Sequence, residues 1–117
     1  MDGQTADLGM RMESQNYYIW IEAEQWASDE WSPTDDNSDV IVSFENGAEW
    51  VATFFTYKNI STLVKKNMLS GECLQGKYFW ASDMILVDEI GRARVEEVVR
   101  HLIDDGEFEK VFRINDE

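Results

Sequence analysis

Hydrophobic and polar residues alternate with a period of two over the first stretch of the chain. Residues 17–26 are rich in aromatic and β-branched side chains, a composition typical of a strand. Since successive strand residues point to opposite faces, the pattern places Ile19, Ile21 and Ala23 on one face. The opposite face then carries Tyr18, Trp20, Glu22 and Glu24. The pattern predicts a strand with one core face and one partly wet face.

Two further strands are predicted over residues 39–44 and 49–56. The dipeptide Asn46-Gly47 lies between them, and Asn-Gly favours a hairpin with a type I′ turn because both central residues then need positive φ. Both faces of residues 49–56 are largely apolar, so we expect this strand to be central in the sheet.

Helical spacing replaces alternation in two later segments. In residues 58–70 the apolar set is Ile60, Leu63, Val64 and Met68. Asn59 or Ser61 is the expected N-cap, and Gly71 the expected end. Residues 92–105 form the clearest helix, with Gly106 as C-cap. Its apolar positions are Val95, Val98, Val99, Leu102 and Ile103.

The remaining segments give weaker patterns. Residues 78–81 and 84–87 are strand-like and predict one bent strand interrupted at Ser82-Asp83, whereas residues 108–114 fit a helical turn or a strand equally well. The element order is β-β-β-α-β-α-(β). It predicts an α+β fold with a mostly antiparallel sheet of four to five strands and two helices packed on one face. The other face of the sheet would be left available to a partner.

Length and composition fit one domain. The chain has 117 residues, of which 44% are hydrophobic. Residues 1–14 lack periodicity and predict a flexible N-terminal tail, which leaves 15–117 as a single α+β domain. The only cysteine is Cys73, residues 1–12 lack a signal-peptide pattern, and no apolar run approaches ~18 residues. We therefore expect a cytoplasmic protein, bacterial in the style of its sequence, with no membrane contact.

Acidic residues are concentrated in the first half. The net charge is −14, from 24 acidic and 10 basic residues, and no lysine or arginine occurs between Met12 and Tyr57. That stretch holds Glu13, Glu22, Glu24, Asp29, Glu30, Asp35, Asp36, Asp39, Glu45 and Glu49. From Lys58 onward the charge is nearly balanced. Acidity of this kind can serve solubility alone, but its self-repulsion also costs stability, so a functional use is the second interpretation.

Candidate catalytic groups are few. Glu22 and Glu24 share a predicted strand face and could act as an acid–base pair, although two solvated carboxylates explain them as well. His101 has Glu97 and Asp105 one helical turn away, which fits a surface histidine with an i,i+4 carboxylate neighbour. Cys73 fits an incidental cysteine. We expect no catalytic residue and no cofactor, because the chain offers no nucleophile motif and no glycine-rich loop.

A calcium loop is the one metal motif worth testing. Asp35, Asn37 and Asp39 match the first ligand positions of an EF-hand, but Val40 and Asn46 occupy the positions that require Gly and Glu. We therefore expect no specific metal site. Direct nucleic-acid binding is disfavoured as well, because it depends on basic patches.

The acidic first half suggests a binding protein that inhibits or neutralises a basic macromolecule. The expected partner is a basic protein, such as a nuclease toxin or a nucleic-acid-binding protein, and the class would be immunity protein, antitoxin or nucleic-acid mimic. The candidate partner-binding residues are Glu22, Glu24, Asp29, Glu30, Trp31, Asp35, Asp36 and Asp39. One alternative is a small enzyme or ligand-binding domain with a pocket among the sheet aromatics. A structural accessory subunit is the third hypothesis.

Overall fold

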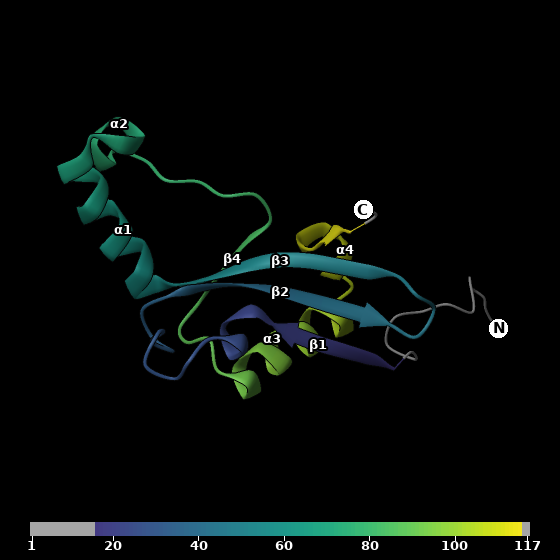
Figure 1. Ribbon diagram of the computed structural model, residues 1–117. Coiled ribbons are helices and arrows are strands. Elements are labelled where there is room, and N and C mark those ends of the chain that lie inside the picture. Colours follow the sequence, from purple (N-terminus) through teal and green to yellow (C-terminus); the bar gives the residue numbers. More distant parts are fainter. Residues whose placement is uncertain (1–15, 116–117) are drawn as a thin grey trace.

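A five-stranded, mostly antiparallel sheet forms the centre of the molecule (Figure 1). The computed structural model describes residues 16–115, so the tail predicted over residues 1–14 lies outside the described residues. The first three strands form an antiparallel meander, as predicted, and the α+β class is confirmed. They are β1 (Tyr17–Ile21), β2 (Asn37–Phe44) and β3 (Glu49–Thr56).

The hairpin between β2 and β3 has the predicted position but a different turn. Of the two turn residues only Gly47 has positive φ, at 93°, and its N–H donates to the carbonyl oxygen of Phe44 at 2.9 Å. This is a type I turn followed by a left-handed glycine, which joins strands across a loop one residue longer than a type I′ turn. The prediction of type I′ was therefore wrong.

Two short strands share the second edge of β3. β4 (Met84–Val87) pairs in parallel with Thr53–Thr56, and β5 (Arg113–Ile114) pairs antiparallel with Trp50 and Val51. Residues 78–81, predicted as strand, are irregular instead: Phe79 packs edge-on against Phe55, with ring centroids 5.4 Å apart. Residues 108–114 contain both of the alternatives considered, because α4 (Phe108–Val111) precedes β5.

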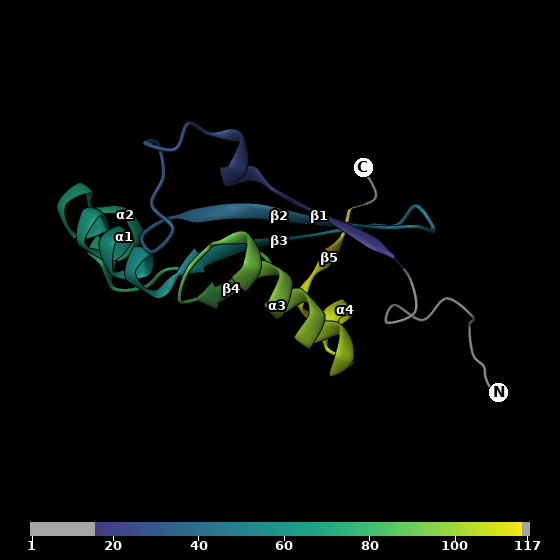
Figure 2. The same cartoon turned by 90° about the horizontal axis from the view of Figure 1, so that it is seen from below.

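The core lies between the sheet and two helices on one side of it, which Figure 2 shows from below. α3 (Arg92–Asp104) buries Val95, Val99 and Ile103. α4 buries Phe108, which stacks on Phe112 with centroids 4.3 Å apart. The sheet contributes Ile19 and Ile21, which were predicted to share a core face, together with Val40, Val42, Phe44, Ala52 and Phe54.

α1 (Tyr57–Ser70) and α2 (Glu72–Gly76) project beyond the end of the sheet (Figure 1). The helix predicted over residues 58–70 therefore forms, but α4, not α1, joins α3 on the face of the sheet. In α1 only Asn59 and Asn67 are buried. The N-cap is Thr56, whose hydroxyl accepts from the N–H of Asn59 at 3.0 Å, so the predicted caps Asn59 and Ser61 were wrong.

α2 is a left-handed turn folded against the end of α1. Gly71 ends α1 as predicted, with φ 87°, and Cys73, Leu74 and Gln75 continue with positive φ. Gly76 closes the turn at φ 82°, where a Cβ atom would lie 2.7 Å from the carbonyl oxygen of Val64. Only glycine permits this approach without a shift. No helix within residues 16–115 has the length and apolar character needed to cross a bilayer.

Candidate functional site

The side of the sheet opposite α3 and α4 carries an apolar centre with carboxylates at its margins. We call it the open face. Strand alternation places on it the residues that do not enter the core. Tyr18 is 65% exposed, and Trp20, Ile41 and Val51 are half-buried. The polar members include Asp39, Ser43, Glu49, Thr53 and Arg113, which is the partner of Val51 in β5, with Glu22 at the corner beyond β1.

Hydrogen bonds across the strands fix these carboxylates. Asp39 accepts from the hydroxyl of Thr53 at 2.8 Å, and Glu49 accepts from the hydroxyl of Ser43 at 3.3 Å. Glu22 accepts from the backbone N–H of Asp39 at 3.2 Å, which brings the two predicted site residues together. Each of these bonds leaves carboxylate lone pairs available to solvent or to a partner.

Glu22 and Glu24 do not share a strand face, contrary to the prediction. β1 ends at Ile21 and the chain turns into a 3-10 helix, η3 (Glu22–Gln25). Because the alternation of the strand ends at Ile21, the Glu22 side chain points to β2 and the Glu24 side chain points to the start of α3. The burial of Ile19, Ile21 and Ala23 was predicted correctly, because the turn still buries Ala23.

Glu24 is neutralised by Arg92. Both carboxylate oxygens accept from the guanidinium at 2.9 Å, a bidentate pair. Arg92 also donates to the carbonyl oxygen of Ile19 at 2.8 Å and to Glu96 at 3.2 Å. Hydrogen bonding to Arg92 lowers the pKa of Glu24 more than desolvation raises it. The carboxylates in turn raise the pKa of Arg92. Glu24 therefore joins β1 to α3 and is occupied within the fold.

Asp35 and Asp36 hold the base of α1. The two oxygens of Asp35 accept from the side chains of Asn59 at 3.2 Å and Thr62 at 3.1 Å. The backbone N–H of Asp36 donates to the hydroxyl of Thr56 at 3.2 Å, and its carbonyl oxygen accepts from the N–H of Thr56 at 3.0 Å. Since Asp35 makes these bonds, it is committed to the junction between loop and helix.

The remaining candidates lie in the loop between η3 and β2. Asp29 and Glu30 are exposed, and Glu30 also accepts from the N–H of Ala27 at 2.9 Å. Trp31 is half-buried and packs against the hydrophobic core. Its ring therefore anchors the loop, and only part of it is available to a partner.

The acidic residues of the first half of the chain differ from those of the second half in how often they form ion pairs. Of the nine acids in residues 16–57, only Glu24 forms an ion pair within residues 16–115. Acids of the second half pair readily with the arginines and lysine beside them. Such pairs join Arg94 to Asp88, Glu89 and Glu97, Arg113 to Asp83, and Lys110 to Glu107. The excess negative charge is therefore unbalanced on the sheet and its loops.

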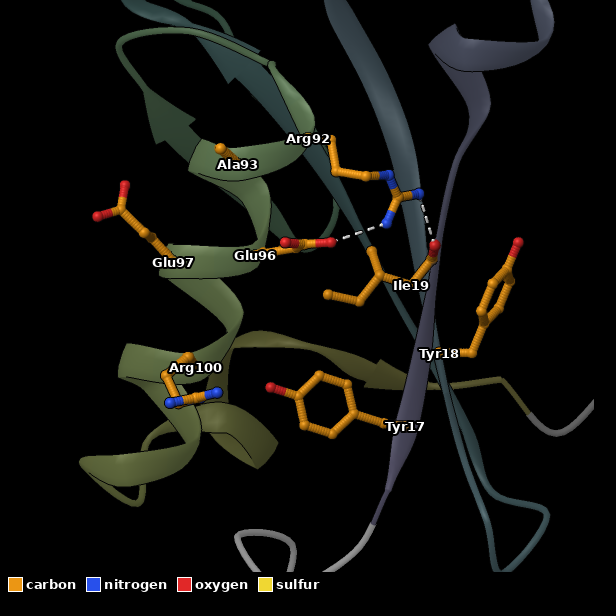
Figure 3. Close-up of a pocket in the computed structure, with 8 residues that line it drawn as sticks. All are labelled: Tyr17, Tyr18, Ile19, Arg92, Ala93, Glu96, Glu97 and Arg100. Carbon is orange, nitrogen blue, oxygen red and sulfur yellow. Dashed lines mark hydrogen bonds and ion pairs between the residues drawn. The ribbon is translucent and has the colours of Figure 1, made fainter.

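An open groove of about 490 Å³ separates β1 from α3 (Figure 3). Tyr17 extends from β1 toward Arg100, whereas Tyr18 leaves the strand on the opposite side. The phenol of Tyr17 raises the pKa of Arg100 most strongly, and the carboxylate of Asp104 raises it by less. The other charged groups of the groove are Arg92, Glu96 and Glu97, which pair with neighbours.

The other residues considered for chemistry have structural explanations. His101 is exposed and pairs with Asp105 at 3.2 Å, the i,i+4 neighbour expected. Cys73 is half-buried in α2 as a free thiol. Asn37 and Asp39 belong to β2, and Asp35 bonds α1, so these three do not form the turn of an EF-hand loop.

Several residues of the open face escaped sequence reasoning. Ile41 and Val51 are direct cross-strand partners, as are Ser43 and Glu49. Alternation along β2 places Ile41 and Ser43 with Asp39, but counting outward from a two-residue Asn46-Gly47 turn would pair Ser43 with Trp50. The longer loop shifts this register by one residue, so the predicted turn could not place Val51 and Glu49 on the same face. Comparison of the chain with protein-family models, with curated proteins and with solved structures gave no match to any of them.

Proposed function

We propose that the protein is a non-catalytic binding protein whose open face takes up a basic macromolecule and neutralises it. The observation that carries the proposal is the ion-pair asymmetry described above. Glu22, Asp39 and Glu49 lie around an apolar centre without a cationic partner among residues 16–115. Uncompensated charge costs stability through self-repulsion, and a cationic partner would relieve that cost.

The layout of the open face supports this role. Protein interfaces combine an apolar centre, rich in aromatic residues, with a polar margin. Tyr18, Trp20, Ile41 and Val51 supply the centre, and the carboxylates supply the margin. Tyr18 replaces Trp31 as the main aromatic anchor, because Trp31 is partly taken up by the core.

A hollow beside β3, on the edge where β4 and β5 pair, suits a cationic side chain. It measures about 270 Å³ and is lined by Asp39, Thr53, Asp83 and Arg113 among others. Arg113 and Asp83 pair at 2.8 Å, which leaves Asp39 as the unpaired charge in its wall. A lysine or arginine of the partner would meet Asp39 there and exchange water for a charge-assisted hydrogen bond.

The electrostatic field of the acidic residues would attract a basic partner before the two proteins touch. Complementary charge raises association rate constants to about 10⁸–10⁹ M⁻¹s⁻¹ at low salt, and the gain falls as salt screens the field. A nuclease toxin or another nucleic-acid-binding protein presents the required positive surface. The protein would then inhibit its partner as an immunity protein, an antitoxin or a nucleic-acid mimic does, in a bacterial cytoplasm.

The alternative, a small-ligand site among sheet aromatics, has the groove between β1 and α3 as its location. Tyr17, Arg92 and Arg100 line it. The guanidinium of Arg92 already pairs with Glu24 and Glu96, and Tyr17 extends toward Arg100, so a ligand would have to displace internal partners. The open face requires no such displacement, and we therefore favour it.

The test is capture of basic proteins on the immobilised chain at low salt, followed by elution with NaCl and calorimetric titration of the eluted partner. We expect the triple variant Glu22→Gln/Asp39→Asn/Glu49→Gln to bind roughly ten-fold or more weakly, with a flatter salt dependence. The reason is that it removes the unpaired charges of the open face and leaves the core intact.

The matched control removes the same number of charges from the helical side, as Asp104→Asn/Asp105→Asn/Glu109→Gln. Binding by this control should stay within about two-fold of wild type, because local charge governs contact more than net charge does. Equal losses in both triple variants would contradict the proposal. So would the absence of any salt-eluted basic protein.

A further inference from the structure

The two helices beyond the sheet, with the segment that follows them, expose most of the large apolar side chains on the surface. We call residues 57–80 the arm. Six of the nine large apolar side chains exposed within residues 16–115 belong to it, and Leu69 is 92% exposed. The six are Tyr57, Met68, Leu69, Leu74, Tyr78 and Trp80. Exposed apolar groups gathered in this way mark an interaction surface.

The fold does not use these side chains. The buried residues of α1 are Asn59 and Asn67, and α2 has none. The base of α1 is fixed by polar contacts, in which Asn59 joins Asn37 and Asp35. The apolar end of the arm, with Met68, Leu69 and Leu74, is thus held out in solvent by a polar joint.

The arm has the opposite charge to the rest of the chain. It contains Lys58, Lys65, Lys66 and Lys77 against Glu72 alone, a net charge of +3. Since the whole chain carries −14, the remainder carries −17. None of the four lysines forms an ion pair with another residue in the part of the chain that the structure describes. The arm therefore fits an acidic, partly apolar surface.

Such a surface is present on the protein itself. The open face combines Tyr18, Trp20 and Ile41 with the carboxylates of Asp39 and Glu49. α1 and α2 lie beyond the end of their own sheet in both views, so contact of Met68, Leu69 and Leu74 with the open face requires another molecule (Figures 1 and 2). An anionic membrane is a poorer match, because it would repel the remaining charge of −17.

We propose that the arm of one copy docks on the open face of a second copy, and that the second arm returns the contact across a two-fold axis. Met68, Leu69 and Leu74 cover the apolar centre, while Lys65 and Lys66 meet Asp39 and Glu49. Reciprocal contacts close the assembly at two copies, as symmetric dimers do. The dimer covers the open face, so a basic partner competes with self-association. It forms from this chain alone and does not rest on the proposed function.

Sedimentation equilibrium of the purified chain tests the proposal. Wild type is expected to shift from 13.6 kDa toward twice this mass as concentration rises. The arm variant Lys65→Glu/Lys66→Glu and the face variant Asp39→Lys/Glu49→Lys should each remain monomeric. Their equimolar mixture should recover the dimer, because the acidic arm meets the basic face and the other contact is native. Circular dichroism establishes that both variants fold.

The single reversal Lys66→Glu has a matched control in Lys110→Glu, an exposed lysine of α4. The first should weaken dimerisation roughly ten-fold, and the second should leave it within about two-fold. A monomer at all concentrations overturns the proposal, as does an arm variant that still dimerises or a mixture that does not. If no basic protein from another source bound the chain, the masses measured by sedimentation would not change. The two proposals can therefore fail independently of each other.

Discussion

The carboxylate of Glu24 is held between three parts of the fold, because Arg92 reaches β1, η3 and α3 at once. Guanidinium and carboxylate meet in two parallel hydrogen bonds, the geometry in which this pair is strongest. The Glu24 side chain remains 35% exposed, so water screens part of the attraction. Its contribution to stability therefore depends on pH in a defined direction.

Because the pKa of Glu24 is lowered in the folded state, its stabilisation is complete above the unfolded value of about 4.3 and is lost as pH falls through the folded value. We expect Glu24→Gln to lower the free energy of unfolding by ~0.5–1 kcal/mol at pH 7. The difference should shrink below about pH 4.3. Urea unfolding at pH 7, 5, 4 and 3 measures it. Asp29→Asn is the charge-matched control. If the loss of stability in Glu24→Gln did not change with pH, the lowered pKa of Glu24 would not be its cause.

Single residues also show where sequence reasoning succeeds and fails. Asp39 and Glu22 were predicted as site residues, and they lie close together because β1 pairs with β2 as the predicted meander requires and Glu22 directly follows β1. Glu24 was misplaced because alternation was extended past Ile21, where the chain leaves the sheet. The contacts that Asp35 makes with Asn59 and Thr62 were not predicted, because these partners lie far along the chain and no local pattern reveals such a contact.

Among the elements, α1 depends on one hydroxyl. Thr56 ends β3, is fully buried, and caps the helix that follows through the N–H of Asn59 at 3.0 Å. The same hydroxyl accepts from the N–H of Asp36 at 3.2 Å, so it ties the helix start to the loop as well. A cap shared in this way joins helix, strand and loop at one point.

Thr56→Val removes that hydroxyl at constant shape and leaves two backbone donors without an acceptor. We expect a loss of ~1–3 kcal/mol in the free energy of unfolding, measured by urea denaturation. Thr56→Ser keeps the oxygen and should recover most of the loss. If the two variants were equally unstable, the methyl group and not the hydroxyl would be responsible.

Strands and helices themselves were largely predictable, because their periods of two and 3.6 are written in the positions of apolar residues. β3 and the burial of Val95, Val99 and Ile103 follow from this rule. The placement of α1 does not. Its apolar positions, such as Leu63 and Met68, have helical spacing, yet periodicity cannot say whether a helix stays on the sheet or leaves it.

At the scale of the whole molecule, charge sets the response to salt. The net charge of −14 stores repulsion that a Debye length of about 10 Å at 0.1 M salt begins to screen. We expect NaCl, raised from about 0.02 to 0.3 M, to increase the melting temperature by a few degrees. Circular dichroism at low protein concentration measures it. Sucrose of equal osmolality is the uncharged control, and a fall in melting temperature with salt would show that paired charges dominate.

The parallel pairing of β3 with β4 has a consequence for how the protein can change. Because Met84 lies opposite Thr53, the chain has to return only about 10 Å along the sheet between the end of β3 at Thr56 and the start of β4. The excursion through α1 and α2 is much longer than this return needs, and it is tied down only at its two ends. An insertion, a deletion or an exchanged helical hairpin between those ends would leave the register of the sheet untouched. The segment is therefore a natural place to graft a new recognition element onto this scaffold.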